Sequence, residues 1–577
     1  MKKINYLILF LFFTICIYAQ IEVVVTADED LYDFVFLKEN VSLLNQKTVS
    51  EALFLTPGLN VIHKGFPVTQ AHVFVKGGSF EQVGVFLDGL RLNDPQTGHY
   101  NFDFPWTSLD IEKVSVMNHG SSIFGSGALN GLLNIKLREI KKDNFELVTD
   151  YGTNNTFYSG LRAAKKFEDG GISISTEKSF SDGYHKETDY SKDAVFLTAS
   201  YLKNNIYLGY DEKEYGAYDY YTPGKNMPSR EYIITRYANI TSEMIDGFKT
   251  SFYVRSHSDV FTLNSNNPSF YQNNHLNFIY GGIFKYNFYF EKDKIFDLQY
   301  NWQREEINSS KLGCHHRIKN AALINSRIIF FGNLKTNLNL AIENYDNYKN
   351  FDMLPSLNFI YDLESINILL NYSYTARYPN WTELYYQDPY NKGDSNLKPE
   401  RSHEVGTGIN YKINDILLKG DVFYREGIDL IDWGKNSLSD PFWQIKNIAK
   451  IKTTGFNLGV DLKMFDIFKL NAIYSYLDSY ISEPYISKYG LAYLRSKISV
   501  DTEIDIYGIL FIIQYVHKAY SNRQDTANMV NMMIDRKINE WLYVSFKIDN
   551  ILNYYFEDIK GIPAPGRSIS GRVKIEF

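Results

Sequence analysis

From about residue 142 to its last residue, the sequence alternates apolar and polar residues in one stretch after another. A period of two is the pattern of a β-strand, whose side chains point to opposite faces in turn. The pattern recurs in 334–342, 366–374, 542–549 and 573–577. A helical membrane protein would need several apolar runs of ~20 residues, and the sequence has one, at its N-terminal end. The sequence therefore predicts a strand-rich chain.

Two kinds of protein carry this alternation. In a soluble antiparallel sheet, the apolar face covers a core and the polar face meets water. In an outer-membrane barrel, the apolar face meets lipid and the polar face lines the lumen. The chain has 46 Tyr and 40 Phe residues, which recur near strand ends as the aromatic girdles of a barrel do. These features favour the barrel over an array of soluble β-sandwiches.

Chain length sets the size of this barrel. Residues 142–577 make 436 residues, and a membrane strand with its share of turns takes roughly 20 residues. About 22 strands follow, and so wide a lumen would leak without a plug. The predicted fold class is an all-β membrane protein, a 22-stranded antiparallel transmembrane β-barrel with an N-terminal α/β plug domain inside.

The first 19 residues are typical of a secretory signal. Lys2 and Lys3 precede a mostly apolar stretch, and Ala19 is a small residue at the cleavage position. Cys16 could suggest a lipoprotein, but Ile15 stands where a lipobox has a small residue; an uncleaved signal anchor is the other alternative. Removal of the signal takes the net charge from -7 to about -9, which does not favour a nucleic-acid partner. Cys314 alone then remains, so no intrachain disulfide can form.

The region from 20 to about 140 has a mixed α/β texture. Thr48 and Glu51 have the spacing of a capping box, which predicts a helix from there to about Leu55, before Pro57-Gly58. Short apolar strands are expected at 72–76, 83–88, 111–117 and 131–137. This region has about the right size to fill the barrel.

The start of the mature chain resembles the TonB box of TonB-dependent outer-membrane receptors. The segment consists of Glu22, Val23, Val24, Val25 and Thr26. An extended, β-branched segment of this kind can pair with the edge of a sheet in a periplasmic partner. The resemblance implies a signal peptide at 1–19, a TonB box segment at 20–30, a plug domain at 31–140 and a transmembrane barrel at 141–577.

Further motifs of the same family follow in the family's order. They are the Pro57-Gly58 turn, Val73 to Gly77, Phe86 to Arg91, and Phe124 to Ile135 in the plug, then 377–385 and 396–400 in the barrel. The segments 548–553 and 563–567 are similar to the C-terminal signature, and Phe577 stands where the family has its terminal aromatic assembly signal.

The sequence departs from the family pattern at the charged lock between plug and barrel. Lys76 replaces an arginine, and 115–120 reads Ser-Val-Met-Asn-His-Gly where the family often has Arg-Gly-Pro. Glu400 and Glu404 keep the acidic side of the lock. The sequence therefore leaves open whether this lock forms.

The loop from Asp94 to Asn101 is expected at the outward apex of the plug. Its candidate ligand-binding residues are Asp94, Gln96, His99, Tyr100 and Asn101, joined by Tyr385 and Tyr386 from a barrel loop. The alternative is that this loop only packs against the barrel wall. With 267–271 and 385–389, it resembles a cobalamin-receptor-like branch of the family.

A few segments of the sequence resemble metal or catalytic sites. Asp211, Glu212, Glu214 and Asp219 suggest an acidic, Tyr-rich extracellular loop whose oxygen ligands could hold Ca²⁺; a solvated loop is the alternative. Gly313 to His316 lacks the ligand spacing of a zinc site. Gly125-Ser126-Gly127 is not followed by the Lys-Ser/Thr of a P-loop, and there is no Gly-x-Ser-x-Gly elbow. No cofactor is required, and an enzyme is not expected.

The resemblance implies an active importer of a scarce, large ligand, a multi-pass β-barrel of the bacterial outer membrane. Its expected partners are the TonB energy-coupling complex of the inner membrane, outer-membrane lipid, the barrel assembly machinery, and a corrinoid or large chelate ligand. Cobalamin or a related corrinoid is the first expectation and a ferric siderophore the second. Residues 379–395 contain no His, which lowers the case for haem. A passive porin or adhesin is the alternative from another class.

Overall fold

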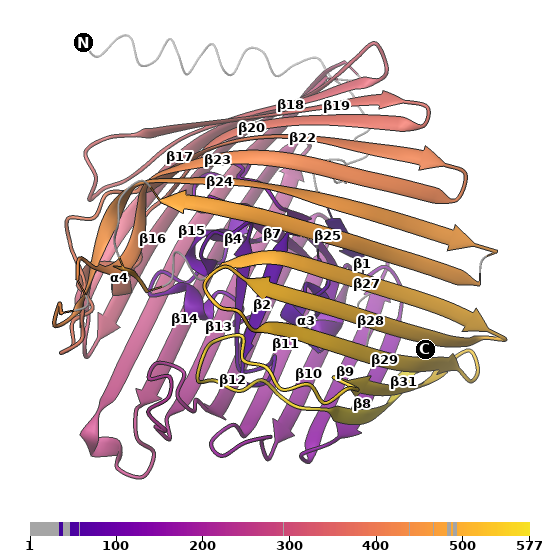
Figure 1. Cartoon of the computed structure of the whole chain (residues 1–577). Coiled ribbons are helices and arrows are strands. Elements are labelled where there is room, and N and C mark those ends of the chain that lie inside the picture. The colour runs from indigo at the N-terminus through magenta and orange to yellow at the C-terminus, as the bar shows by residue number, and fades with distance from the viewer. Residues whose placement is uncertain are drawn as a thin grey trace, which may run out of the picture.

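The computed structural model describes residues 34–37, 47–56, 58–291, 294–437, 439–465, 467–481, 486–488 and 493–577. The expected signal at 1–19 and TonB box at Glu22 to Thr26 lie outside these residues. A closed ring of antiparallel strands surrounds a smaller N-terminal unit, drawn in indigo in Figure 1.

The ring has 22 long strands, as predicted, and two short strand pieces, β21 (Asn391–Lys392) and β26 (Ile486–Ser487). The long strands are β8 (Asn144–Gly152), β9 (Thr156–Phe167), β10 (Gly170–Ser181), β11 (Tyr190–Tyr201), β12 (Asn204–Gly216), β13 (Arg230–Ile245), β14 (Phe248–Thr262), β15 (Gln272–Glu291), β16 (Lys294–Ser309), β17 (Gly313–Phe330), β18 (Leu334–Tyr345), β19 (Asp352–Leu363), β20 (Ile366–Arg377), β22 (Glu400–Ile413), β23 (Ile416–Lys435), β24 (Trp443–Met464), β25 (Phe468–Ile481), β27 (Leu494–Ile506), β28 (Ile509–Tyr520), β29 (Thr526–Lys537), β30 (Leu542–Asp549) and β31 (Ser568–Glu576).

The ring closes where its last strand meets its first. β31 pairs antiparallel with β8, from Ser570 opposite Gly152 to Glu576 opposite Glu146. The main chains of Phe577 and Phe145 also bond each other in both directions, and the Phe577 ring stacks on Trp541. We refer to this junction as the seam.

The two ends of the ring differ. Connections such as 168–169, 202–203, 364–365 and 414–415 are tight turns, while those at the other end include 217–229, 378–399 and 550–567. In outer-membrane barrels the turns are periplasmic and the long loops extracellular. The short helix α4 (Trp381–Tyr385) therefore lies on the outer side.

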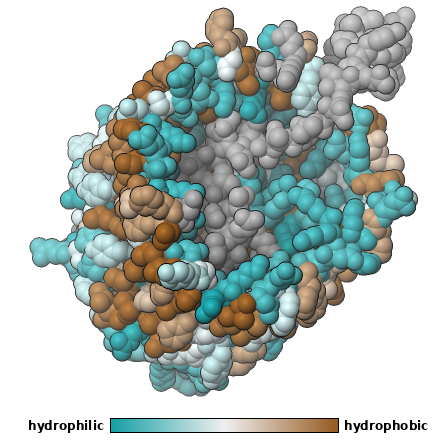
Figure 2. Space-filling view, turned by 90° about the vertical axis from the view of Figure 1, so that its right-hand side faces the viewer, coloured by the Kyte–Doolittle hydropathy of each residue, from teal (hydrophilic) through white to brown (hydrophobic). Residues whose placement is uncertain are grey.

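The strands present apolar residues outward. On β30, Val544 and Phe546 are exposed while Ser545 between them is buried, as the lipid-facing alternation predicted. In Figure 2, which looks into one end of the ring, hydrophilic residues line the hollow and hydrophobic residues gather on the outer side. Among the described residues, no helix is long and apolar enough to cross a membrane.

The N-terminal unit is a five-stranded sheet with a separate hairpin. The sheet order is β1-β6-β7-β4-β5, and β2 pairs with β3. Its elements are β1 (Phe34–Leu37), α3 (Val49–Ala52), β2 (Leu59–Lys64), β3 (Gln70–Val75), β4 (Val83–Leu87), β5 (Leu90–Arg91), β6 (Ile111–Met117) and β7 (Gly131–Leu137).

Most of the local predictions for this unit are confirmed. β6 and β7 have the predicted bounds, and β3 and β4 differ by one or two residues. The capping box forms, since Thr48 Oγ1 accepts from the Glu51 N–H and Glu51 accepts from the Thr48 N–H. The helix is shorter than expected, because it ends at Ala52 and turns follow before Gly58. Val85, Leu133, Ile135 and Val116 form the centre of the core, which continues onto Phe196 of the wall.

Candidate functional site

Three turns of the plug face the outer end of the barrel, and we call them the apical turns: 65–69, 76–82 and 93–101. The first contacts Tyr220 of the extracellular loop 217–229. The third bonds the loop 378–399, since the Trp381 and Thr382 amides donate to the Pro95 and Gln96 carbonyls. The expected position of the 94–101 loop, toward the outer mouth, is therefore confirmed.

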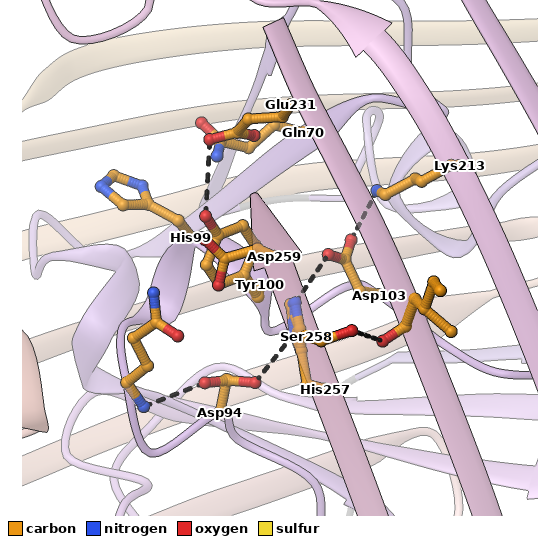
Figure 3. Close-up of polar contacts among 12 residues, drawn as sticks. Gln70, Asp94, His99, Tyr100, Asp103, Lys213, Glu231, His257, Ser258 and Asp259 are labelled. Carbon is orange, nitrogen blue, oxygen red and sulfur yellow. Dashed lines mark hydrogen bonds and ion pairs between the residues drawn. The ribbon is translucent and has the colours of Figure 1, made fainter. Parts of the chain in front are cut away.

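The side chains of this loop turn mostly to the wall. Asp94 accepts from Arg255 of β14 at 2.8 Å. It also lies 3.3 Å from His257 Nδ1 on the same strand (Figure 3). Gln96 accepts from Asn277 at 2.6 Å. Asn101 stays within the loop, where its side-chain oxygen accepts from the Asp94 N–H.

Tyr100 is buried in the same way, with its hydroxyl toward Glu231 of β13 (Figure 3). Asp94, Gln96, Tyr100 and Asn101 are thus all buried, which is the packing alternative weighed for this loop. Only His99 of the five predicted residues is partly exposed. The expectation that all five face incoming ligand does not hold here, because buried partners on the wall satisfy the polar groups at this depth.

His99 belongs to a group of rings that the sequence analysis missed. His99 Nδ1 and His72 Nε2 are 2.8 Å apart, and both imidazoles pack against Phe80 at centroid distances of 4.9 and 4.1 Å. Phe74 and Tyr221 complete the group. His72 and Phe74 were predicted only as strand residues, and nothing in their local pattern brings Phe80 or Tyr221 to them.

Charged groups under the apical turns have altered pKa values. Burial lowers the pKa of Lys64 to about 7, and its Nζ donates to the Tyr220 carbonyl. Burial and the nearby Glu383 carboxylate raise the pKa of Glu81 to about 7. Glu81 accepts from the Gly98 N–H at 2.7 Å and from Thr97 Oγ1 at 3.1 Å, so it fixes the turn that carries His99.

Tyr385 and Tyr386 are both partly exposed in the extracellular loop 378–399. The Tyr385 ring stacks on His315 at 3.6 Å, and the hydroxyl of Tyr386 lies 3.1 Å from that of Tyr271. His315, in the segment that lacks the ligand spacing of a zinc site, is therefore an aromatic packing residue. Cys314 is exposed.

The charged lock that the sequence left open does form. Lys76 Nζ donates to Glu404 at 2.9 Å, with both side chains buried, so lysine serves where the family has arginine. Glu400 accepts from Gln82 at 2.9 Å and pairs with Arg377. The acidic side thus has partners both on the plug and on the barrel.

A different kind of contact holds the β2–β3 hairpin. Lys497 of β27 donates to the main-chain carbonyls of Phe54, Thr56 and Leu59, at 2.6, 3.0 and 3.0 Å. Lys518 of β28 donates to the Val61 carbonyl and Lys213 of β12 to those of Val68 and Thr69. These three lysines contact the plug's main chain, although Lys213 also pairs with the Asp103 side chain.

The four carboxylates predicted as a calcium loop do not converge. Asp211, Glu212 and Glu214 lie on strand β12, so the prediction of a loop is wrong for them. Alternation places Asp211 inside with Lys192, while Glu212 bonds Tyr232 and Glu214 bonds Arg230. Asp219 accepts from its own loop, at Asn226 and Met227. In the described part of the chain, no group of three or more His, Cys, Asp or Glu residues is arranged to hold a metal ion.

Comparison with known families gives two matches that together run from residue 35 to residue 528. Residues 35–132 match the TonB-dependent Receptor Plug Domain. Residues 92–528 match the TonB dependent receptor-like, beta-barrel family. The two matches overlap over residues 92–132, a stretch that includes the plug loop 94–101.

Individual proteins support the same likeness. The chain is 21% identical over 553 residues to the vitamin B12 transporter BtuB of Photobacterium profundum, covering 90% of this chain and 88% of that protein. The copper transporter OprC has the same fold, with a TM-score of 0.79 at 12% identity over 94% of this chain and 97% of the other. The siderophore receptor PirA of Acinetobacter baumannii has a TM-score of 0.75 at 12% identity, over 96% and 100%.

Proposed function

This chain belongs to the TonB-dependent receptors of the outer membrane, and from that premise we propose that it actively imports a corrinoid such as cobalamin. Members of this family are receptors and transporters. They are coupled to TonB and bind large ligands. The choice of corrinoid is supported by the likeness to a vitamin B12 transporter along 90% of the chain.

The filled lumen is the observation that carries active import over a passive pore. The plug is fastened to the wall by buried ion pairs, such as Lys76 with Glu404 and Asp94 with Arg255. Removing one partner of such a pair strands a buried charge and costs about 3–5 kcal/mol. Spontaneous opening is therefore rare, and a ligand passes only when work is done on the plug. That is the physical need that an energy-coupling partner meets.

We assign the coupling to Glu22 to Thr26. Replacing Val24 with proline removes a backbone donor and prevents strand pairing with a partner sheet. Ligand binding should persist while uptake is lost. Loss of binding in the same variant would mean that the segment is structural, and uptake that survives deletion of 22–27 would indicate a porin.

Growth of a receptor-deletion strain tests the ligand. Cells carrying this chain should grow on limiting cobalamin, and cells without it should not. Growth on ferric siderophores instead would support the second candidate. It is favoured by lysines that lie over aromatic rings at the outer end of the barrel: Lys311 on Tyr271, Lys392 on Phe442 and Lys435 on Trp443. Such pairs suit an anionic ligand with flat rings.

Calcium at the outer loops remains a prediction. If it binds, it recruits Asp219 with loop oxygens rather than the strand residues Glu212 and Glu214. Titration of the purified receptor with Ca²⁺, with and without cobalamin, would show whether the ion contributes to binding.

A further inference from the structure

We propose that His72 and His99 form a two-nitrogen site for a divalent transition-metal ion of the Cu²⁺ or Ni²⁺ type at the outward face of the plug. The remaining coordination positions are filled by water or by donor atoms of an incoming chelator. This site goes beyond corrinoid import and does not rest on it. Its evidence is the arrangement of two imidazoles that belong to separate elements, β3 and the third apical turn.

The separation of the nitrogens fits this class of ion. His72 Nε2 and His99 Nδ1 are 2.8 Å apart. Two nitrogens at ~2.0 Å from a metal, at a right angle, are roughly 2.8 Å apart, and square-planar or tetragonal nitrogen sites are typical of Cu²⁺ and Ni²⁺. The same spacing excludes both imidazoles from one haem or corrinoid ring, where two axial ligands stand on opposite faces.

Phe80 preorganises the pair. Its ring lies 4.1 Å from His72 at 8° and 4.9 Å from His99 at 28°, and the two imidazole centroids are 4.8 Å apart. These three distances place both imidazoles on one side of the phenyl ring. A small rotation of each imidazole in its own plane keeps this stacking and aims both lone pairs at one point. Little ordering remains to be done on binding.

The hydrogen bond between the two rings also suits a metal. It joins His72 Nε2 to His99 Nδ1, the two nitrogens that would face the ion. One proton lies between the facing nitrogens. When an ion takes its place, the imidazole that held it carries its single proton on its other ring nitrogen, and the pair releases none.

One imidazole of the pair, that of His99, is partly exposed, although His72 is buried. His99, Phe74 and Phe80 are partly exposed, and Tyr221 of the extracellular loop 217–229 packs edge-on against His99 at 5.5 Å. In Figure 3 the His99 imidazole extends away from the Asp94, His257 and Asp103 group beneath it. The pair therefore presents a partly exposed imidazole on the side away from these acidic contacts.

Cu²⁺ titration of the purified full-length receptor tests the proposal. Untagged protein should carry Cys314→Ser and His316→Ala, because that exposed thiol and imidazole could bind copper adventitiously. We expect one bound ion whose electron paramagnetic resonance signal shows two nitrogens. His99→Gln should weaken binding at least 30-fold and leave one nitrogen. His185→Ala, in an exposed loop, is the matched control and should change nothing.

A second variant gives a change in the opposite direction and does not depend on a damaged fold. Lys64→Met removes a positive charge close to the pair, so affinity for Cu²⁺ should rise about threefold or more if a cation binds there. Unchanged affinity in the His72→Ala and His99→Ala double variant, or weaker binding in Lys64→Met, would mean an adventitious ion only. Cobalamin-dependent growth is scored separately, so failure of either proposal leaves the other standing.

Discussion

The β2–β3 hairpin and the 93–101 turn are both held against the barrel wall, but by different chemistry. Lys497, Lys518 and Lys213 hold the hairpin, and the segment just before it, through hydrogen bonds to main-chain carbonyls. The turn is held side chain to side chain, as in Asp94 with Arg255. A carbonyl is present whatever the plug residue is, so the first contact depends only on the barrel. The second needs both partners and fails when either changes.

The largest effect should follow from breaking the side-chain contact. Arg255→Met leaves the fully buried Asp94 carboxylate without its main partner, which should cost about 3–5 kcal/mol. Hydrogen exchange of amides 92–101 in the intact receptor measures this. Adding Asp94→Asn, which keeps the acceptor for the Gln96 N–H, should recover most of the loss. Additive losses in the double variant would contradict an ion-pair role.

The 93–101 turn should also respond to pH, through Glu81 of the plug, which accepts from Thr97 and Gly98. Burial and Glu383 raise the pKa of Glu81 to about 7, from 4.5 in the unfolded chain. The folded state therefore binds the Glu81 proton more tightly than the unfolded chain does. The contribution of this proton to the stability of the folded state is complete below pH 4.5 and is lost as pH rises to 7. The change amounts to about 3 kcal/mol. Exchange of 97–99, corrected for intrinsic rates, should be slower at pH 5 than at pH 8, and Glu81→Gln should abolish the difference.

Breaking the main-chain contact should have a smaller, more local effect. Lys497→Met leaves three carbonyls without their donor, but also removes a buried charge, so we expect about 2 kcal/mol. Exchange should quicken in 53–62 and stay unchanged in 92–101 of the same sample. Loosening of both regions would show that the two contacts are not independent.

The smallest effect is expected from the plug side of that contact. Thr56 offers its carbonyl to Lys497, while its buried hydroxyl oxygen has no hydrogen-bond partner in the described structure. Thr56→Val keeps the shape and the carbonyl, so stability should change by no more than about 0.5 kcal/mol. A loss of stability above 2 kcal/mol would show that the Thr56 side chain also contributes to the contact with the barrel wall.

The alternation along the chain was enough to predict the barrel, because one face of each strand meets lipid and the other the lumen. The alternation also predicted which side of 542–549 faces outward. Local apolar runs predicted the bounds of β6 and β7. The alternation did not separate strand from loop at Asp211 to Glu214, because charged residues occupy both faces of the strand there. The barrel wall extends beyond the membrane, where a polar outward face is no longer costly.

The site was harder to predict for a different reason. His99 could be singled out from its loop, but its partners His72 and Phe80 lie on other elements, and only the folded plug brings them together. The plug sequence could not indicate the lysine contacts, because their acceptors are main-chain carbonyls, which every residue has. The lock between Lys76 and Glu404 spans 328 positions, and the replacement of arginine obscured it.

The pairing of β31 with β8 has a consequence for how the chain is made. Glu576 and Glu146 are opposite each other. The first strand of the ring therefore cannot form this pairing until the last strand, some 430 residues later, is in place. Closing so long a loop costs roughly 5 kcal/mol in chain entropy, and this cost arises before the contacts between β31 and β8 can offset it. Until then β8 and β31 are open edges, ready to pair with a neighbouring chain. The ring therefore cannot be closed from the N-terminal end, and a chain that ends before Ser568 lacks β31 and leaves an open sheet.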